Sequence, residues 1–224
     1  GPNASTGEAT LDTLVLDESP VGEDEGGDFD PAGLASTTAN FADNFNAADY
    51  GTDGAGSTSY SLSLTGSDVP SGLFALDALD TDAGDGDGIG QGDEILLNQS
   101  GNTITGSVGA TDYFTISVDP TTGVVTFTQL ANVWHADPSD DDDTSTLTLS
   151  NANLLQLVQT VTDADGDSDT ASLNLGTGVF QIEDDGPTAI NPESTALLNK
   201  NGATQTALLD LDGNVDNNTG TDGF

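Results

Sequence analysis

Cysteine, methionine and arginine are absent from this sequence, and its basic side chains are limited to Lys200 and His135. Without cysteine there can be neither a disulfide framework nor a thiolate metal site. Without basic clusters the chain cannot present the positive surface that nucleic acids or anionic membranes require. No apolar run reaches the roughly 20 residues of a membrane-spanning helix. For a secreted protein that lacks disulfides, bound metal is the expected substitute cross-link.

Negative charge is what the sequence has in excess. Its 39 acidic residues give a formal net charge of -38, and most of them are aspartates. Aspartate favours turns and short-armed metal loops, whereas helices prefer glutamate. Like charges at this density repel within the Debye length of about 8 Å and destabilise the compact state. Because basic residues are nearly absent, counterions must relieve this repulsion, and divalent ions held in specific loops do so most effectively.

Short alternating apolar segments predict an all-β fold. Residues 60–64 and 114–118 alternate apolar with polar side chains, which is the period of a strand with one buried face. The segment 119–123 contains proline and ends in glycine, which predicts a hairpin leading into 124–130. We expect further strands at 11–17, 73–79, 94–97, 103–108, 147–149, 157–162, 170–175 and 179–182, a helical turn at 151–155 and an irregular connection at 31–56. Many short strands separated by turns are typical of a β-sandwich or barrel.

The sharpest metal-site signal is a loop in which aspartates alternate with small residues between two expected strands. Alternate side chains of an extended or turning backbone converge on one side, and Gly166 permits a tight turn. Ca²⁺ takes about six to eight oxygen ligands at about 2.3–2.6 Å, so the loop is predicted to bind calcium. A solvated polar turn is the alternative. The candidate ligands are Asp163, Asp165, Asp167 and Asp169.

Three further acidic groups are candidate calcium sites. The first is interleaved with glycines and fits neither an EF-hand loop nor a nonapeptide β-roll; it comprises Asp77, Asp80, Asp82, Asp85, Asp87, Asp93 and Glu94. The second follows Trp134 and His135 and comprises Asp137, Asp140, Asp141, Asp142 and Asp143. Four consecutive aspartates cannot all bind one ion, so the candidate ligands in it are Asp137, Asp140 and Asp142. For these two groups the alternative is a disordered or solvated loop. The third joins both ends of the expected domain, as a metal-stiffened inter-domain joint requires, and comprises Asp17, Glu18, Glu183, Asp184 and Asp185.

Sites of this kind would contribute much of the stability. Extracellular calcium modules have a Kd of about 10⁻⁴–10⁻³ M. At a hundredfold excess of ion over Kd, one site adds about 2.7 kcal/mol to the free energy of unfolding. Two or three sites would rival the whole stability of a typical domain, about 5–15 kcal/mol. We therefore expect a loose or unfolded calcium-free state and a rigid calcium-bound state.

The domain organisation is inferred from local sequence. Residues 1–10 are polar and are expected to be a flexible leader, and their opening Gly-Pro dipeptide is typical of what protease removal of a tag leaves. Residues 11–188 are expected to form one β-sandwich module. The tetrapeptide Gly-Thr-Asp-Gly at 51–54 recurs at 220–223, so residues 189–224 are interpreted as a linker and the opening of a following or split module.

The closing part of this region resembles a known repeat. The run LVQTVTDADGDSDTASLNLG at 157–176, followed by VFQIEDDGP at 179–187, is similar to the closing signature of repeat modules in large RTX adhesins, which Gram-negative bacteria export by type I secretion. Residues 60–64 and 132–137 resemble the middle of that repeat, and the resemblance extends over 11–188.

The resemblance implies an immunoglobulin- or cadherin-like β-sandwich with long acidic, calcium-binding loops. Such modules form tandem arrays on the bacterial cell surface, project a binding domain and support adhesion and biofilm formation. The implied partners are adjacent modules of the same chain, and host-cell or biofilm ligands reached through neighbouring domains.

The sequence also permits other functions. A calcium-dependent sugar- or peptide-binding module would stack aromatic rings on its ligand, and Trp134, Tyr50, Tyr60 and Tyr113 are the candidates. A split domain could carry an inserted ligand-binding domain. The alternating strands disfavour an unstructured calcium buffer. An enzyme is not expected, because no Ser/His/Asp order or His-Glu-x-x-His motif occurs and His135 is interpreted as a packing or surface residue.

Overall fold

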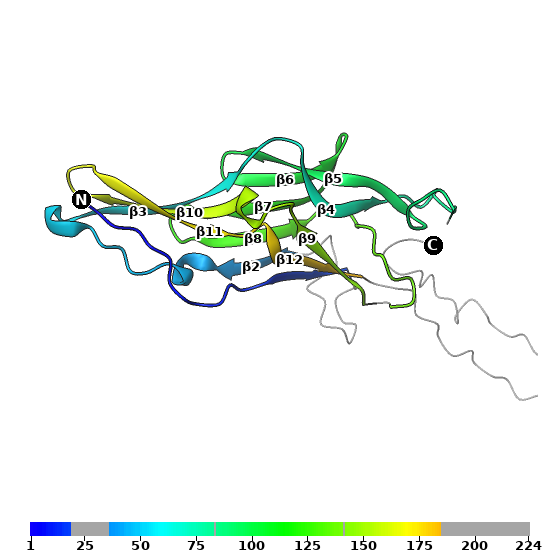
Figure 1. Cartoon of the computed structure of the whole chain (residues 1–224), viewed down its shortest axis with the longest axis horizontal. Helices are drawn as coiled ribbons and strands as arrows, with labels where there is room; N and C mark the ends of the chain where they lie inside the picture. Colours follow the sequence, from blue (N-terminus) through cyan, green and yellow to red (C-terminus); the bar gives the residue numbers. More distant parts are fainter. Residues whose placement is uncertain (19–35, 83, 141, 185–224) are drawn as a thin grey trace, which may run out of the picture.

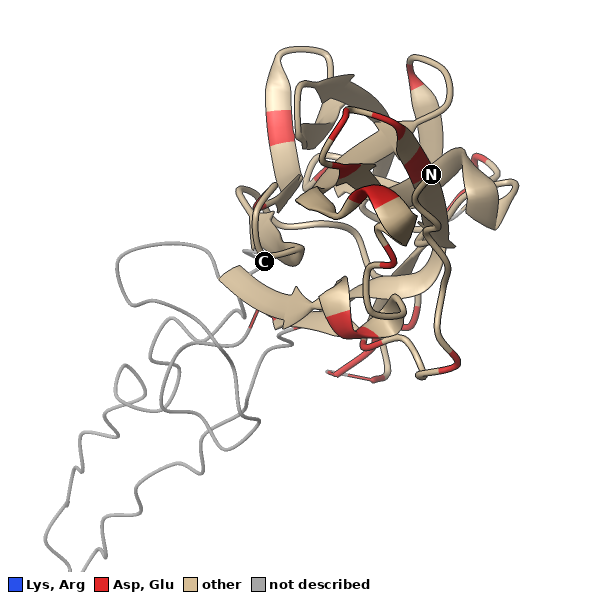
Figure 2. Ribbon diagram, turned by 90° about the vertical axis from the view of Figure 1, so that its left-hand side faces the viewer, with Lys and Arg blue, Asp and Glu red and all other residues tan. Residues whose placement is uncertain are grey.

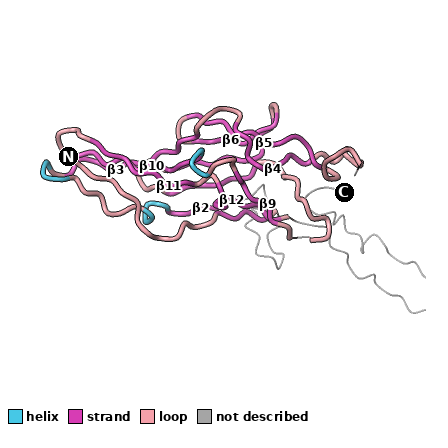
Figure 3. Tube along the Cα trace, viewed as in Figure 1, coloured by secondary structure: helices cyan, strands magenta, loops and turns pink. Residues whose placement is uncertain are grey.

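Strands and loops make up almost all of the fold in a computed structural model that describes residues 1–18, 36–82, 84–140 and 142–184. No α-helix occurs in these residues, and Figure 3 shows their helical content as short 3-10 turns. The strands are β1 (Leu14–Asp17), β2 (Ser36–Asn40), β3 (Ala55–Leu64), β4 (Val69–Leu76), β5 (Gln91–Ser100), β6 (Thr103–Val108), β7 (Thr111–Val118), β8 (Val124–Gln129), β9 (Thr144–Thr148), β10 (Leu155–Asp163), β11 (Ser168–Asn174) and β12 (Thr177–Glu183). The 3-10 turns are η1 (Phe41–Asn44), η2 (Gly51–Asp53) and η3 (Ala152–Leu154). The predicted all-β fold is confirmed.

The strands are arranged as a β-sandwich. One layer is a six-stranded antiparallel sheet in the order β2-β8-β7-β6-β5-β4. Two three-stranded sheets, β11-β10-β3 and β1-β12-β9, pack against it. All pairings are antiparallel except that of β1 with β12, which is parallel. Figure 1 shows a molecule that is elongated, with the N-terminus and the β10–β11 turn at one end and the β4–β5 loop at the other.

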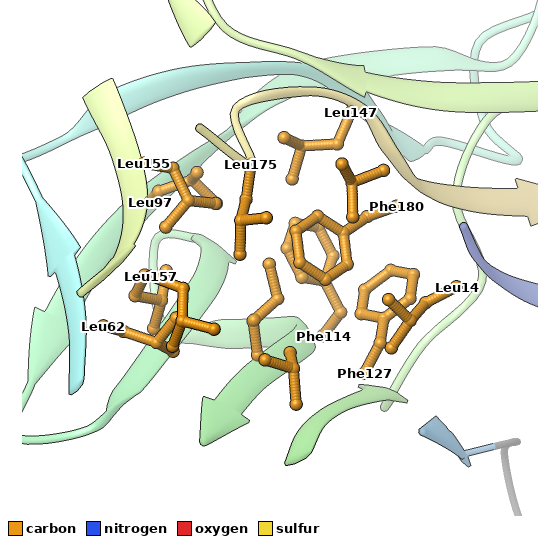
Figure 4. Packing of buried hydrophobic residues seen from close by; sticks show 14 of the residues in the cluster. Leu14, Leu62, Leu97, Phe114, Phe127, Leu147, Leu155, Leu157, Leu175 and Phe180 are labelled. Carbon is orange, nitrogen blue, oxygen red and sulfur yellow. The ribbon is translucent and has the colours of Figure 1, made fainter. Parts of the chain in front are cut away.

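Aromatic side chains join the two layers. Phe114 of β7, Phe127 of β8 and Phe180 of β12 are fully buried. Phe127 lies edge-on between the other two rings, at centroid distances of 5.6 Å from Phe114 and 5.2 Å from Phe180 (Figure 4). Leucines from all three sheets surround these rings, so one continuous core holds the sandwich together.

The predicted hairpin between β7 and β8 is confirmed. Gly123 closes the turn with φ +74°, a conformation that favours glycine, and its N–H donates to the carbonyl of Asp119 at 3.0 Å. The Asp119 carboxylate accepts hydrogen bonds from the N–H groups of Thr121 and Thr122 at 2.8 and 2.9 Å. The Thr122 and Thr121 hydrogen bonds lower the pKa of Asp119, since they favour its charged form. The hairpin of β10 and β11 is confirmed as well.

Two expectations about the strands are wrong. The irregular connection expected at 31–56 contains β2, whose small polar residues give no apolar pattern. β2 forms because its backbone pairs with β8, from Ser36 opposite Thr128 onward. Leu79, expected to end a strand, lies beyond β4 and is 91% exposed.

The first residues of the chain run beside the segment that follows η1. The N–H of Asn3 donates to the carbonyl of Asp49 at 2.8 Å, and the N–H of Gly7 donates to the carbonyl of Asn44 at 2.7 Å. Residues 1–10, for which the sequence predicts a flexible leader, are thus placed by backbone hydrogen bonds. The predicted linker and opening segment at 189–224 lies outside the described residues.

Candidate metal-binding sites

The charged side chains of the described chain are almost all acidic. None of the described residues is a lysine or arginine, and the ribbon in Figure 2 marks acidic positions on loops and strands and shows no basic one. Within the described ranges, three groups bring potential ligand atoms within 4.8 Å of one another: Asp53, Asp163 and Asp165; Asp80, Asp85 and Asp87; Glu18, His135 and Asp184. The residues of these groups lie in loops, in turns or at the ends of strands.

The first group is centred on Asp163, the last residue of β10. Asp163 is only 3% exposed. Its Oδ1 accepts a hydrogen bond from the N–H of Asp167 at 2.9 Å, and its own N–H donates to the carbonyl of Asp167 at 2.9 Å. Gly166, at φ +101°, allows the chain to reverse between them. The Oδ2 atom of Asp163 is buried and has no hydrogen-bond partner in the described part of the chain.

Asp53 reaches this group from η2 because β3 pairs with β10. The pairing places Ala55 opposite Asp163, and the N–H of Ala164 donates to the carbonyl of Gly54 at 3.0 Å. The terminal amino group of Gly1 lies 3.6 Å from Oδ2 of Asp53. The sequence analysis missed Asp53; its signal was the Gly-Thr-Asp-Gly tetrapeptide, which was interpreted as a repeat.

The four aspartates predicted to converge on one side take different positions. Asp163 and Asp165 belong to the group with Asp53. Asp167 is exposed, and its backbone rather than its carboxylate binds Asp163. Asp169 lies in β11, where its Oδ2 accepts a hydrogen bond from the N–H of Ala4 at 2.9 Å.

The second group lies in the loop between β4 and β5. A side-chain hydrogen bond with Asp85 raises the pKa of the exposed Asp87, and slight desolvation and the charges of Asp85 and Asp80 raise it further. Carboxylates this close repel one another when both are ionised, and a shared cation would relieve that repulsion.

Other acids predicted for this group serve the local backbone. Asp77 accepts a hydrogen bond from the N–H of Leu79 at 2.9 Å, and Asp82 accepts one from the N–H of Gly84 at 2.9 Å. Asp93 and Glu94 lie in β5 instead. Asp93 is exposed, and Glu94 accepts a hydrogen bond from the N–H of Gly72 at 3.0 Å.

The acidic run after His135 forms a hydrogen-bonded turn. Hydrogen bonds from the hydroxyl and N–H of Ser139 lower the pKa of Asp137. Asp140 accepts a hydrogen bond from the N–H of Asp142 at 3.3 Å. Asp143, a member of the predicted cluster, accepts hydrogen bonds from the N–H groups of Ala136 and Asp137 at 3.0 Å each. This carboxylate therefore fixes the backbone next to His135.

The predicted pairing of acids from both ends of the domain is seen in the β1–β12 pair. Asp17 lies opposite Glu183 in the parallel register, and the N–H of Glu18 donates to the carbonyl of Glu183 at 3.0 Å. Burial, together with the charges of Asp142 and Asp17, raises the pKa of Glu183. Asp17, Glu18 and Asp184 are 5%, 0% and 8% exposed. Asp185 lies outside the described residues.

His135 joins these acids, and the sequence analysis did not include it. Its Nε2 lies 3.8 Å from Oε2 of Glu18. A faint signal existed in the sequence: the single histidine of the chain immediately precedes an acidic run. The acids that His135 meets, Glu18 and Asp184, are however far from it in the sequence.

The aromatic residues considered for ligand stacking have structural neighbours. Tyr60 is in the core, 9% exposed, and its hydroxyl accepts a hydrogen bond from Gln159 at 3.2 Å. Trp134 donates from Nε1 to the carbonyl of Ile89 at 2.9 Å, and it packs edge-on against Phe74. Trp134 thereby connects the loop before β9 with the β4–β5 loop.

The architecture defines a β-sandwich module with clustered acids at its loops and strand ends. The chain belongs to a domain family of unknown function, DUF5801, whose family model matches residues 13–176, from β1 through β11. Searches of curated proteins and of solved structures gave no match. No helix among the described residues has the length and apolarity to span a membrane.

Proposed function

We propose that this chain is a calcium-rigidified structural module, an extender, of a secreted bacterial surface adhesin that supports adhesion and biofilm formation. The observation that carries the proposal is the carboxylate of Asp163. It is nearly fully buried, and one of its oxygens has no hydrogen-bond partner among the described residues. A buried ionised carboxylate is costly unless a cation or several donors compensate it.

Calcium is the cation that this environment favours. Asp53 and Asp165 supply further carboxylate oxygens beside Asp163, so three carboxylates face a single nearby ammonium, that of Gly1, and negative charge remains in excess. Hard oxygen ligands, some from carboxylates and some from backbone carbonyls, are the usual ligands of Ca²⁺. The group in the β4–β5 loop has the same composition.

The shape of the molecule suits a link in a linear array. The Asp163 group lies with the β10–β11 turn at one end of the long axis, and the β4–β5 loop lies at the other (Figure 1). Ions at both ends would stiffen the loops that neighbouring modules of the same chain contact. The resemblance of residues 157–176 to RTX adhesin repeats supports an extracellular location on the bacterial surface after type I secretion.

The proposed role is mechanical, so the chain itself is not an enzyme in this proposal. Contacts with host-cell or biofilm ligands would be made through neighbouring domains. A calcium-dependent sugar- or peptide-binding module remains the other function considered from the sequence, but the aromatic contacts of Tyr60 and Trp134 do not favour it.

A calcium titration of the full chain tests this function. We expect the melting temperature, followed by circular dichroism, to rise with calcium, and small-angle scattering to show a more compact and rigid particle than in chelator. Magnesium at the same ionic strength is the control for simple charge screening. One melting temperature in calcium and in chelator would contradict the proposal, as would an equal effect of both ions.

A further inference from the structure

A second type of metal ligand is buried at the ends of β1 and β12. The side chain of His135 is 2% exposed, and that of Glu18 is 0% exposed. Asp184 follows β12 directly, and ligand atoms of the three residues lie within 4.8 Å of one another. The carboxyl ends of two parallel strands and the loop before β9 meet here, which brings together residues that are far apart in the sequence.

Glu18 is fixed with one oxygen directed at His135. Its Oε1 accepts hydrogen bonds from the N–H of Val133 at 3.1 Å and from the side-chain amide of Gln129. Its Oε2 lies 3.8 Å from Nε2 of His135. That distance is too long for a hydrogen bond. Two ligands that each lie about 2.0–2.2 Å from one ion can be up to about 4.4 Å apart, so the same distance fits a shared cation.

Ser145 lies between His135 and Trp134. The oxygen of its hydroxyl is 3.3 Å from the carbonyl oxygen of Trp134 and 3.1 Å from Nδ1 of His135. Both contacts are hydrogen bonds in one arrangement, in which the hydroxyl proton goes to Trp134 and Nδ1 donates to the Ser145 oxygen. In the neutral ring, Nε2 then carries the lone pair. This nitrogen is buried and has no hydrogen-bond partner within the described residues.

A lone pair facing a carboxylate oxygen is repulsive unless a cation lies between them. A proton on Nε2 is one such cation. A metal ion is the other. Metal-bound histidines commonly donate from the second ring nitrogen to a neighbouring oxygen, and the Ser145 oxygen lies 3.1 Å from that nitrogen of His135.

We propose that His135, Glu18 and Asp184 bind a divalent transition-metal ion of the Zn²⁺ or Mn²⁺ class, through Nε2 and one oxygen of each carboxylate. Imidazole nitrogen is a good ligand for such ions, whereas Ca²⁺ selects oxygen. The ion would tie the end of β1 to the end of β12 and to the loop before β9. The proposal takes Glu18 and Asp184 from the inter-domain joint for which the sequence predicts calcium, because His135 adds a nitrogen ligand there. The site does not depend on the Asp163 group or on the group in the β4–β5 loop.

Pulsed electron paramagnetic resonance of Mn²⁺ bound to the full chain tests the assignment. Because His135 is the single histidine, an imidazole ¹⁴N modulation can come from this residue alone. Excess calcium in the sample would saturate the exposed carboxylates. We expect ¹⁴N coupling in the wild-type chain and in Asp165→Asn, and no coupling in His135→Gln. Bound Mn²⁺ without nitrogen coupling would reveal only non-specific binding to acids and would overturn the proposal.

Zn²⁺ titration by calorimetry in excess calcium provides the affinity. Mutating an outer-shell partner of a metal costs about 10–100-fold in affinity, so losing the ligand in His135→Gln should weaken Zn²⁺ binding at least about tenfold. Asp165→Asn, in the other group, should leave it unchanged. Equal affinities of wild type and His135→Gln would reject the site.

A measurement on the wild-type chain covers the case in which His135→Gln does not fold. In protein labelled with ¹⁵N-histidine, we expect Nε2 to be unprotonated at pH 7 and its resonance to shift on addition of one equivalent of Zn²⁺. An imidazolium spectrum at pH 7, or a resonance that zinc leaves in place, would show that the group is a metal-free ion pair.

Discussion

At the scale of single residues, Asp163 combines burial with charge. Its Oδ1 is satisfied by a backbone donor, but its Oδ2 has no partner in the described chain. An asparagine at this position would keep the acceptor for Asp167 and would remove the charge. This change should therefore destabilise the calcium-bound protein but not the calcium-free protein.

Asp163→Asn should abolish most of the calcium-dependent stabilisation that this site provides, which is about 2.7 kcal/mol at a hundredfold excess of ion over Kd. In chelator the variant should be as stable as wild type or more stable, because a buried charge is lost. Chemical denaturation with and without calcium measures both values. Asp112→Asn, at an exposed position in β7, is the matched control. An unchanged calcium response in Asp163→Asn would contradict the prediction.

Phe180 connects the two layers at one point of the core. Phe180→Ala removes a fully buried ring that packs 5.2 Å from Phe127. Large-to-small substitutions of this kind cost about 3–5 kcal/mol in the free energy of unfolding. Leu79→Ala, at a position that is 91% exposed, should change stability by less than about 0.5 kcal/mol. Similar losses in the two variants, measured by denaturant unfolding in calcium, would show that Phe180 is not part of a tightly packed core.

At the scale of elements, the fit between β6 and β7 depends on a glycine. Gly106 pairs with Phe114 across the two strands. The Phe114 ring covers the position that a Cβ atom at residue 106 would take. The aromatic ring thus occupies space that only glycine leaves free.

Gly106→Ala should force Phe114 out of its rotamer and destabilise the sheet by about 1–3 kcal/mol, which is the usual cost of overpacking. Ser107→Ala, at the next position of β6, changes no such contact and should cost much less. Thermal unfolding of the two variants in calcium gives the comparison. A Gly106→Ala protein as stable as wild type would mean that the ring moves freely.

At the scale of the whole molecule, charge opposes folding. The formal charge of -38 belongs to a chain with nearly no basic residues. Folding brings these negative charges closer together, so without bound ions their mutual repulsion destabilises the folded state. Glu183 is one residue at which this repulsion acts. Burial and the charges of Asp142 and Asp17 raise its pKa. An acid with a raised pKa binds protons more strongly in the folded state than in the unfolded state.

Glu183 should therefore make the chelated protein less stable as pH rises. Its contribution is fully present below its ordinary pKa of 4.5 and is lost as pH rises through the raised value. Glu183→Gln, which mimics the protonated acid, should be more stable than wild type at pH 7 and similar to it near pH 4.5. Melting temperatures of both proteins in chelator, from about pH 4.5 to pH 7, measure the difference in stability between wild type and Glu183→Gln. Glu8→Gln, at an exposed position, should show no such gap; a gap of the opposite sign for Glu183→Gln would refute the argument.

Much of the fold could be predicted from local sequence because alternation and turn chemistry are local signals. The buried alternation of residues 114–118 and the Asp-Pro…Gly turn at 119–123 specify a hairpin without reference to the rest of the chain. β2 could not be predicted in this way, since its small polar residues pair through the backbone with β8.

The sequence by itself determined that the protein is all-β and where its acidic turns occur, because composition and period-two alternation act over short distances. Which acids share a site was decided only by the tertiary structure. The β3–β10 pairing brings Asp53 to Asp163, and the parallel β1–β12 pair brings Glu18 and Asp184 to His135. Strand pairing joins residues that are remote along the chain, and no local pattern encodes which partners will meet.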